Sequence, residues 1–330
     1  MQHTSCILRV LFTLSMLWSS AAAEMAANKP QSDVPALKPG KTLRLIQRQT
    51  GVKSQRTGPV TVVIEVPIEV SVLRVGDDGV VIRWKRGVTK IVDVDSADLR
   101  RNPDIKPLVM KMTAEQLGPI AATTDNLTTE LAFDRDLQYA GLRNYDDVAA
   151  AANRAMDELD KLRAGRGLPP IEAAIRKAMF NRSTLEYSMT KEALLYFGWM
   201  ALPMQRGETG EFEGLLPNQF GGDPTPATVS AELAAEPDAQ GRLVLRTTSQ
   251  VDVEKYIKSL RKAIENTPGA KPLEPDAEQQ LRDLKIGSTA EHHIDPATGL
   301  ATLATVKSAA SVGGKAQSEE FHWTVAPAER

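Results

Sequence analysis

The sequence has little cysteine, histidine or aromatic content. Of its 330 residues one is cysteine and four are histidine, and aromatic residues make up 5%. The cysteine, Cys6, lies in a segment with the features of a cleaved signal peptide. The mature chain is therefore expected to have no disulfide bonds and no thiol chemistry. Cys6 also lies too early to be a lipidated cysteine at the cleavage point, so no acyl anchor is expected.

Long apolar runs are also missing. The run from Val10 to Trp18 follows Arg9 and precedes Ala21 and Ala23, small residues of the kind that a signal peptidase reads. We expect a signal peptide over residues 1–23 and export to the periplasm. The run is about half of the roughly 20 residues that a membrane-spanning helix needs, and nothing later approaches that length, so no membrane span is expected in the mature chain. Residues 24–40, rich in proline and without periodicity, are predicted to form a flexible leader.

An excess of basic charge is absent. The chain has 40 Lys and Arg against 42 Asp and Glu, a net charge of −2. Nucleic-acid-binding proteins carry a clustered basic surface, so nucleic acid is not an expected partner. The hydrophobic content of 42% is ordinary for a globular protein, and a chain of this length can bury a large core.

The chain is rich in extended segments with β-branched residues. Residues 60–73 and 80–92 are predicted as a hairpin closed by an Asp-Gly turn, with Pro67 marking an edge or a bulge. Helical spacing dominates between 145 and 200, and strands return after residue 226. The predicted fold is therefore α+β: a curved antiparallel β-sheet with the helices of 145–200 packed on one face.

The order of elements suggests an internal duplication. The hairpin around Gly79 corresponds to one around Gly241, and "TELAFD", ending at Asp134, corresponds to "AEHHID", ending at Asp295. On this basis we predict a first α+β half over 41–165 and a second over 166–330. A single continuous domain is the alternative, because the halves can share one sheet.

The stretch "EHHID", residues 291–295, raises the question of a metal site. Adjacent residues of a strand point to opposite faces, so His292 and His293 are poorly placed to bind one ion. Only one of them could join His322 and a carboxylate in a zinc-like set. The sequence favours an ordinary strand, with one histidine half-buried and the other solvated, and predicts no metal ligands.

One motif raises the question of catalysis. "SMTK", Ser188 to Lys191, has the Ser-x-x-Lys spacing of penicillin-recognising enzymes, in which the lysine activates the serine. "SLRK" at 259–262 has the same spacing, and the Lys-Thr-Gly and Ser-Asp-Asn partner motifs are missing from the sequence. No phosphate loop, dinucleotide fingerprint or His-Glu-x-x-His motif occurs either. No catalytic residues and no cofactor are therefore predicted.

Four segments carry a family resemblance: "LKPGKTLRL", "TTELAFDRDLQYAGLRNYDDV", "LLPNQFGG" and "HHIDPATGLATLATV". With these motifs the chain resembles an uncharacterised family of exported proteobacterial proteins of unknown function. Its expected architecture is more remotely similar to the half-barrel carriers of the lipoprotein-localisation type. That likeness implies an acyl chain held under a helical cover.

The function expected is that of a non-catalytic periplasmic protein that binds an apolar or lipid-like ligand, or an envelope partner. Two alternatives stay open. The first is a serine-dependent envelope hydrolase using Ser188 and Lys191, and the second is a purely structural interaction module. The four residues Tyr196, Phe197, Trp199 and Met200 are predicted to form core rather than a ligand pocket.

Overall fold

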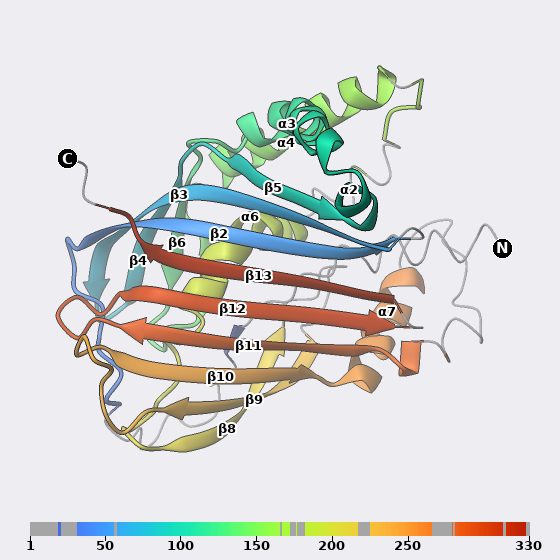
Figure 1. Ribbon diagram of the computed structural model, residues 1–330. Coiled ribbons are helices and arrows are strands. Elements are labelled where there is room, and N and C mark those ends of the chain that lie inside the picture. Colours follow the sequence, from blue (N-terminus) through green and yellow to red (C-terminus); the bar gives the residue numbers. More distant parts are fainter. Residues whose placement is uncertain are drawn as a thin grey trace.

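The computed structural model describes residues 19–20, 32–55, 58–165, 167–171, 176, 182–216, 225–265, 279, 281–312 and 315–327. Most of the predicted signal peptide, residues 217–224 with the sequence "PNQFGGDP", and nearly all of 172–181 in the stretch with helical spacing lie outside these residues. Within them the chain forms one antiparallel sheet of 13 strands (Figure 1).

The strands follow one another across the sheet in the order β1-β8-β9-β10-β11-β12-β13-β2-β3-β4-β6-β7, while β5 pairs separately with β3. Their bounds are β1 Ser19–Ser20, β2 Thr42–Gln55, β3 Gly58–Gly76, β4 Gly79–Arg86, β5 Lys90–Ser96, β6 Thr128–Phe133, β7 Tyr139–Leu142, β8 Thr209–Leu216, β9 Thr225–Leu233, β10 Leu243–Val251, β11 Lys285–Ile294, β12 Ala301–Val312 and β13 Lys315–Val325.

The helices lie between these strands in the sequence. They are α2 (Ala97–Arg101), the short 3-10 helix η1 (Pro103–Ile105), α3 (Lys106–Ala122), α4 (Tyr145–Ala164), α6 (Arg182–Phe197) and α7 (Val253–Glu265). In Figure 1, α6 lies behind the sheet, while α3 and α4 lie together beyond β5. The predicted α+β fold, with a curved and unclosed antiparallel sheet, is confirmed.

The sheet curves around the C-terminal part of α6. Tyr196 packs against Trp84 of β4 at 5.4 Å and Trp323 of β13 at 5.8 Å, measured between ring centroids. The same buried cluster includes Leu233 of β9 and Leu245 of β10. Strands distant in the sheet therefore share one core. A second cluster lies under α7 and contains Tyr256, Ile257 and Leu260 with residues of β9 to β12.

The opposite face of the sheet carries cross-strand ion pairs. Arg48 of β2 pairs with Glu65 of β3 at 3.5 Å, and Arg246 of β10 pairs with Glu291 of β11 at 2.8 Å. These side chains are exposed to a third or more, so each pair contributes little stability, about 0–1 kcal/mol. They show instead which face meets water.

The segment predicted as one strand over 80–92 is divided into two. β4 ends at Arg86 and β5 begins at Lys90, and the two pair with different parts of β3. Pro67 lies on β3 where the partner changes. Since proline has no N–H to donate, it tolerates this position. It is therefore not on an edge strand but at a change of partner within the sheet.

Two groups of four strands have the same topology. In the first, the hairpin β3–β4 leads through helices to the hairpin β6–β7, and β4 pairs with β6. In the second, β9–β10 leads through α7 to β11–β12, and β10 pairs with β11. Leu131 faces Ile82 in the first group as His292 faces Leu245 in the second. β13 and β2 join the two groups into one continuous sheet.

Candidate functional site

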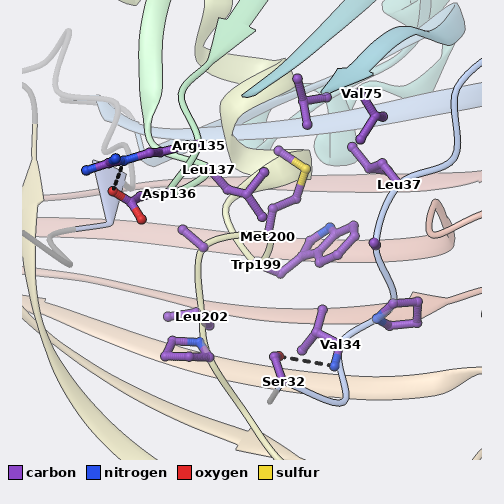
Figure 2. Close-up of a pocket in the computed structure, with 15 residues that line it drawn as sticks. Ser32, Val34, Leu37, Val75, Arg135, Asp136, Leu137, Trp199, Met200 and Leu202 are labelled. Carbon is purple, nitrogen blue, oxygen red and sulfur yellow. Dashed lines mark hydrogen bonds and ion pairs between the residues drawn. The ribbon is translucent and has the colours of Figure 1, made fainter. Parts of the chain in front are cut away.

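A pocket of about 290 Å³ lies where several hairpin ends meet the end of α6 (Figure 2). Four segments far apart in sequence line it: residues 32–37, the ends of the β3–β4 hairpin, the corner at 135–137, and the turn at 199–203. Most of the side chains that line it are apolar. The volume is at the lower end of ligand pockets, which span roughly 300 to 1,000 Å³. It suits a small apolar ligand or part of a single chain.

One wall is formed by residues 32–37, which we term the strap. Their backbone is fixed at both ends: the amide of Asp33 donates to the Met204 carbonyl at 2.9 Å, and the amide of Lys38 donates to the Thr298 carbonyl at 3.2 Å. The Asp33 carboxylate also accepts from the amide of Arg206 at 3.0 Å. This part of the segment predicted as leader thus makes specific contacts before it enters β2.

The strap rests on a glycine. Gly299, in the turn between β11 and β12, has φ +74°, and a Cβ added there would lie 2.4 Å from the carbonyl oxygen of Ala36. No real side chain tolerates that approach, and the positive φ also favours glycine. The sequence "DPATG" at 295–299 therefore makes a seat for the strap.

The opposite wall includes a leucine in a left-handed conformation. Leu137 has φ +61° in the corner between β6 and β7. The Oδ1 atom of Asp134 closes this corner by accepting from the amides of Asp136 and Gln138, each at 2.9 Å. Figure 2 shows the Leu137 side chain directed toward Met200 and Trp199. A left-handed conformation costs leucine on the order of 1 kcal/mol, whereas glycine adopts it without this strain. The corner therefore keeps an apolar side chain at this wall despite the strain.

The aromatic cluster predicted as core divides between core and pocket. Tyr196 and Phe197 are buried with their rings 4.8 Å apart, and the Tyr196 hydroxyl donates to the Ala301 carbonyl. Trp199 and Met200 are also buried but contribute to the pocket wall. The sequence could not separate the two roles, because all four residues are large, mainly apolar and within five positions of one another.

Two charged residues stand at the side of the pocket. Arg135 and Asp136 belong to the same corner as Leu137, and the Nε atom of Arg135 lies 3.7 Å from Oδ2 of Asp136. The Arg135 side chain is 79% exposed and that of Asp136 is 35% exposed. The pocket is thus apolar inside and charged at its rim.

The two adjacent histidines point to opposite faces of β11. His292 is buried, and its Nε2 lies 3.4 Å from the Leu195 carbonyl oxygen. Burial lowers the pKa of His292 to about 4, so it is neutral at pH 7. His293 contacts Asp238 at 2.7 Å and Glu291 at 2.9 Å. His322 contacts Thr305 instead, at 2.9 Å. Among the described residues, no three His, Cys, Asp or Glu side chains are grouped as a metal site would require.

The Ser188 and Lys191 side chains have other partners. The Ser188 hydroxyl donates to the Leu185 carbonyl at 3.0 Å. The Lys191 ammonium donates to the Glu319 carboxylate and lies 5.1 Å from the centroid of the Phe321 ring. These contacts fix α6 to β13. They give Lys191 a structural role and do not direct it to Ser188.

None of the helices in the described parts of the chain is both long and apolar enough to cross a membrane. No family model matches the sequence, and no curated protein matches it.

Solved structures give distant likenesses. Lipovitellin, described in terms of lipid–protein interactions, matches with a TM-score of 0.45 and 10% identity over 89% of this chain. The chain spans only 26% of lipovitellin. DynF from the dynemicin pathway of Micromonospora chersina matches with a TM-score of 0.20 and 6% identity, over 92% of this chain and 90% of DynF. An outer membrane channel from Pseudomonas putida F1 matches with a TM-score of 0.24 and 10% identity, over 91% of this chain and 100% of the channel. At these TM-scores the likenesses carry no argument about this chain.

Proposed function

We propose that this protein is a non-catalytic, exported binding protein that holds a small apolar or lipid-like ligand in the pocket beneath the strap. The observation that carries the proposal is the pocket itself, about 290 Å³ with a largely apolar wall. Leu137 supports it, because the corner keeps that side chain at the wall despite its left-handed φ of +61°. Export to the periplasm is part of the proposal and is motivated by residues 1–23.

The size of the pocket limits the ligand. A cavity of this volume has room for one short chain and not for a whole two-chain lipid. Each buried CH₂ group contributes about 0.8 kcal/mol, which is roughly a fourfold gain in affinity. We therefore expect affinity for a series of straight-chain alcohols to rise with chain length and then to stop rising when the pocket is full.

The test is displacement of an uncharged fluorescent probe, N-phenyl-1-naphthylamine, by these alcohols. Ala201 lines the pocket, and Ala201→Phe fills part of it. This variant should lose most of the probe binding, while Ala150→Phe, at an exposed position of α4, should bind as the wild type does. Equal binding by both variants, or no binding by the wild type, would contradict the proposal.

A partner protein is the second candidate, and an exposed apolar stripe favours it. Ile105 of η1 and Leu108 and Met112 of α3 are each more than 40% exposed. Their spacing places them on one side of this helical segment. A photo-crosslinking residue at Leu108, compared with one at the exposed Ala114 on the other side of the same helix, would test it in cells. A discrete crosslinked product at position 108 alone supports a partner protein, and the absence of a product at both positions opposes this candidate.

A further inference from the structure

We infer that the ligand of the pocket is an anionic amphiphile with a single chain, and that Arg135 binds its carboxylate-like head. The inference rests on the proposed function and adds the chemistry of the head group. The observation is a juxtaposition: Arg135, whose side chain is 79% exposed, and the apolar Leu137 come from one corner, two residues apart, and both residues line the pocket. Figure 2 shows Arg135 and Asp136 beside the pocket, with the Arg135 side chain directed away from Leu137 and Met200, so its charge lies outside the apolar wall. An amphiphile needs this combination of an outer charge and an inner apolar wall.

The one ion pair of Arg135 among the described residues does not use its two terminal guanidinium nitrogens. Its ion pair with Asp136 is made through Nε at 3.7 Å, which is longer than a charge-assisted hydrogen bond. Among the described residues no other partner of Arg135 is found, and its side chain is 79% exposed, so its two terminal nitrogens are accessible to a ligand. These nitrogens form the planar fork that binds a carboxylate through two parallel hydrogen bonds.

Asp136 sets the selectivity of the rim. Its carboxylate lies beside the guanidinium and repels an incoming anion, so it competes with the ligand head for Arg135. A neutral head has no charge–charge attraction to Arg135 and no charge–charge repulsion from Asp136. Removing Arg135 should therefore weaken binding of an acid, and removing the charge of Asp136 should strengthen it, while an alcohol of the same length is unaffected. A merely structural role of the two residues would not give opposite signs.

The neighbouring hairpin offers a matched control. Arg74 and Asp78, at the β3–β4 turn, form an ion pair at 2.7 Å with side chains 54% and 64% exposed. This pair is similarly exposed but does not line the pocket. Arg74→Gln changes the net charge of the protein as Arg135→Gln does, so it reports any effect of general electrostatic attraction.

The experiment compares decanoic acid with decanol by displacement of the uncharged probe at pH 8 and low salt. Arg135→Gln should weaken the acid about fivefold, since exposed ion pairs contribute up to ~1 kcal/mol and salt screens them. Asp136→Asn should strengthen it, and Arg74→Gln should leave both ligands unchanged. Equal effects of Arg135→Gln and Arg74→Gln, or equal loss of acid and alcohol, would overturn the inference while leaving the pocket in place. Failure of the wild type to bind either compound would instead overturn the proposed function.

Discussion

The two four-stranded groups share a topology but differ at the positions where they meet the core and the strap. Leu131 and His292 hold equivalent places in the strand ladders and are both almost fully buried, at 0% and 1% exposure. One group thus buries an apolar side chain where the other buries an imidazole. The corners that follow differ as well, since Leu137 of the first lines the pocket and Gly299 of the second seats the strap. The same strand topology therefore provides part of the pocket wall in the first group and the contact for the strap in the second.

The largest expected effect comes from making the first group resemble the second. Leu131→His places an imidazole in an apolar site between Ile82 and Leu142. Loss of the buried leucine and burial of a polar ring should lower the free energy of unfolding by about 3 kcal/mol or more at pH 7. Urea denaturation measures it. Leu108→His, at an exposed position, is the control, and a similar small change in both would show that position 131 is not buried as described.

The reverse change should remove a sensitivity to acid. The pKa of His292 is about 4 in the folded protein against about 6.5 in an unfolded chain. Between these values the unfolded state binds a proton that the folded state does not, so stability falls as the pH falls from 6.5 to 4. The loss reaches roughly 3 kcal/mol by pH 4, because one pKa unit is ~1.4 kcal/mol.

His292→Leu should flatten this part of the stability profile, while Leu108→Ala, at an exposed position, should not. Urea midpoints at pH 7, 6, 5 and 4 measure the effect. An unchanged profile in His292→Leu would mean that another group causes the acid response.

A smaller effect separates the two corners. Gly299→Ala brings a Cβ against the Ala36 carbonyl and strains a positive φ, so it should cost about 2 kcal/mol and loosen the strap. Leu137→Gly relieves a strained φ but removes apolar contact, so its stability should change by less than about 1 kcal/mol while probe binding falls. Hydrogen exchange at the amides of Asp33 and Lys38 should speed up in the first variant only. Faster exchange in both would mean that the strap depends on Leu137 too.

Local sequence predicted the hairpins whose turns carry their own signal. The β3–β4 turn contains glycine and aspartate. In the corner between β6 and β7, Asp134 accepts hydrogen bonds from two backbone amides. β2 and β8 were not predicted. β2 is rich in arginine and glutamine, and its buried Gln47 is explained only by the hydrogen bond from Trp323 at 2.9 Å. Its partner lies at the other end of the chain, beyond the range of local patterns.

The pocket could not have been found in the sequence. Its walls come from the strap, a hairpin, a corner and the end of α6, and no motif links them. The one local signal was a leucine in the "DRDLQ" corner, at a place where turn chemistry favours glycine or asparagine. Arg135 and Asp136 would otherwise read as ordinary solvated turn residues.

By itself the sequence determined the class of the fold, because alternating β-branched segments, aspartate-glycine turns and amphipathic helices act over short distances. It also predicted that the side chains of His292 and His293 point to opposite faces of a strand, because successive strand residues face opposite ways. Only the tertiary structure decided that Lys191 pairs with Glu319, that the strap rests on Gly299, and that four distant segments line one pocket. Such contacts depend on how long strands far apart in sequence pair and on how the sheet curves around α6, and local sequence patterns do not reach over those distances.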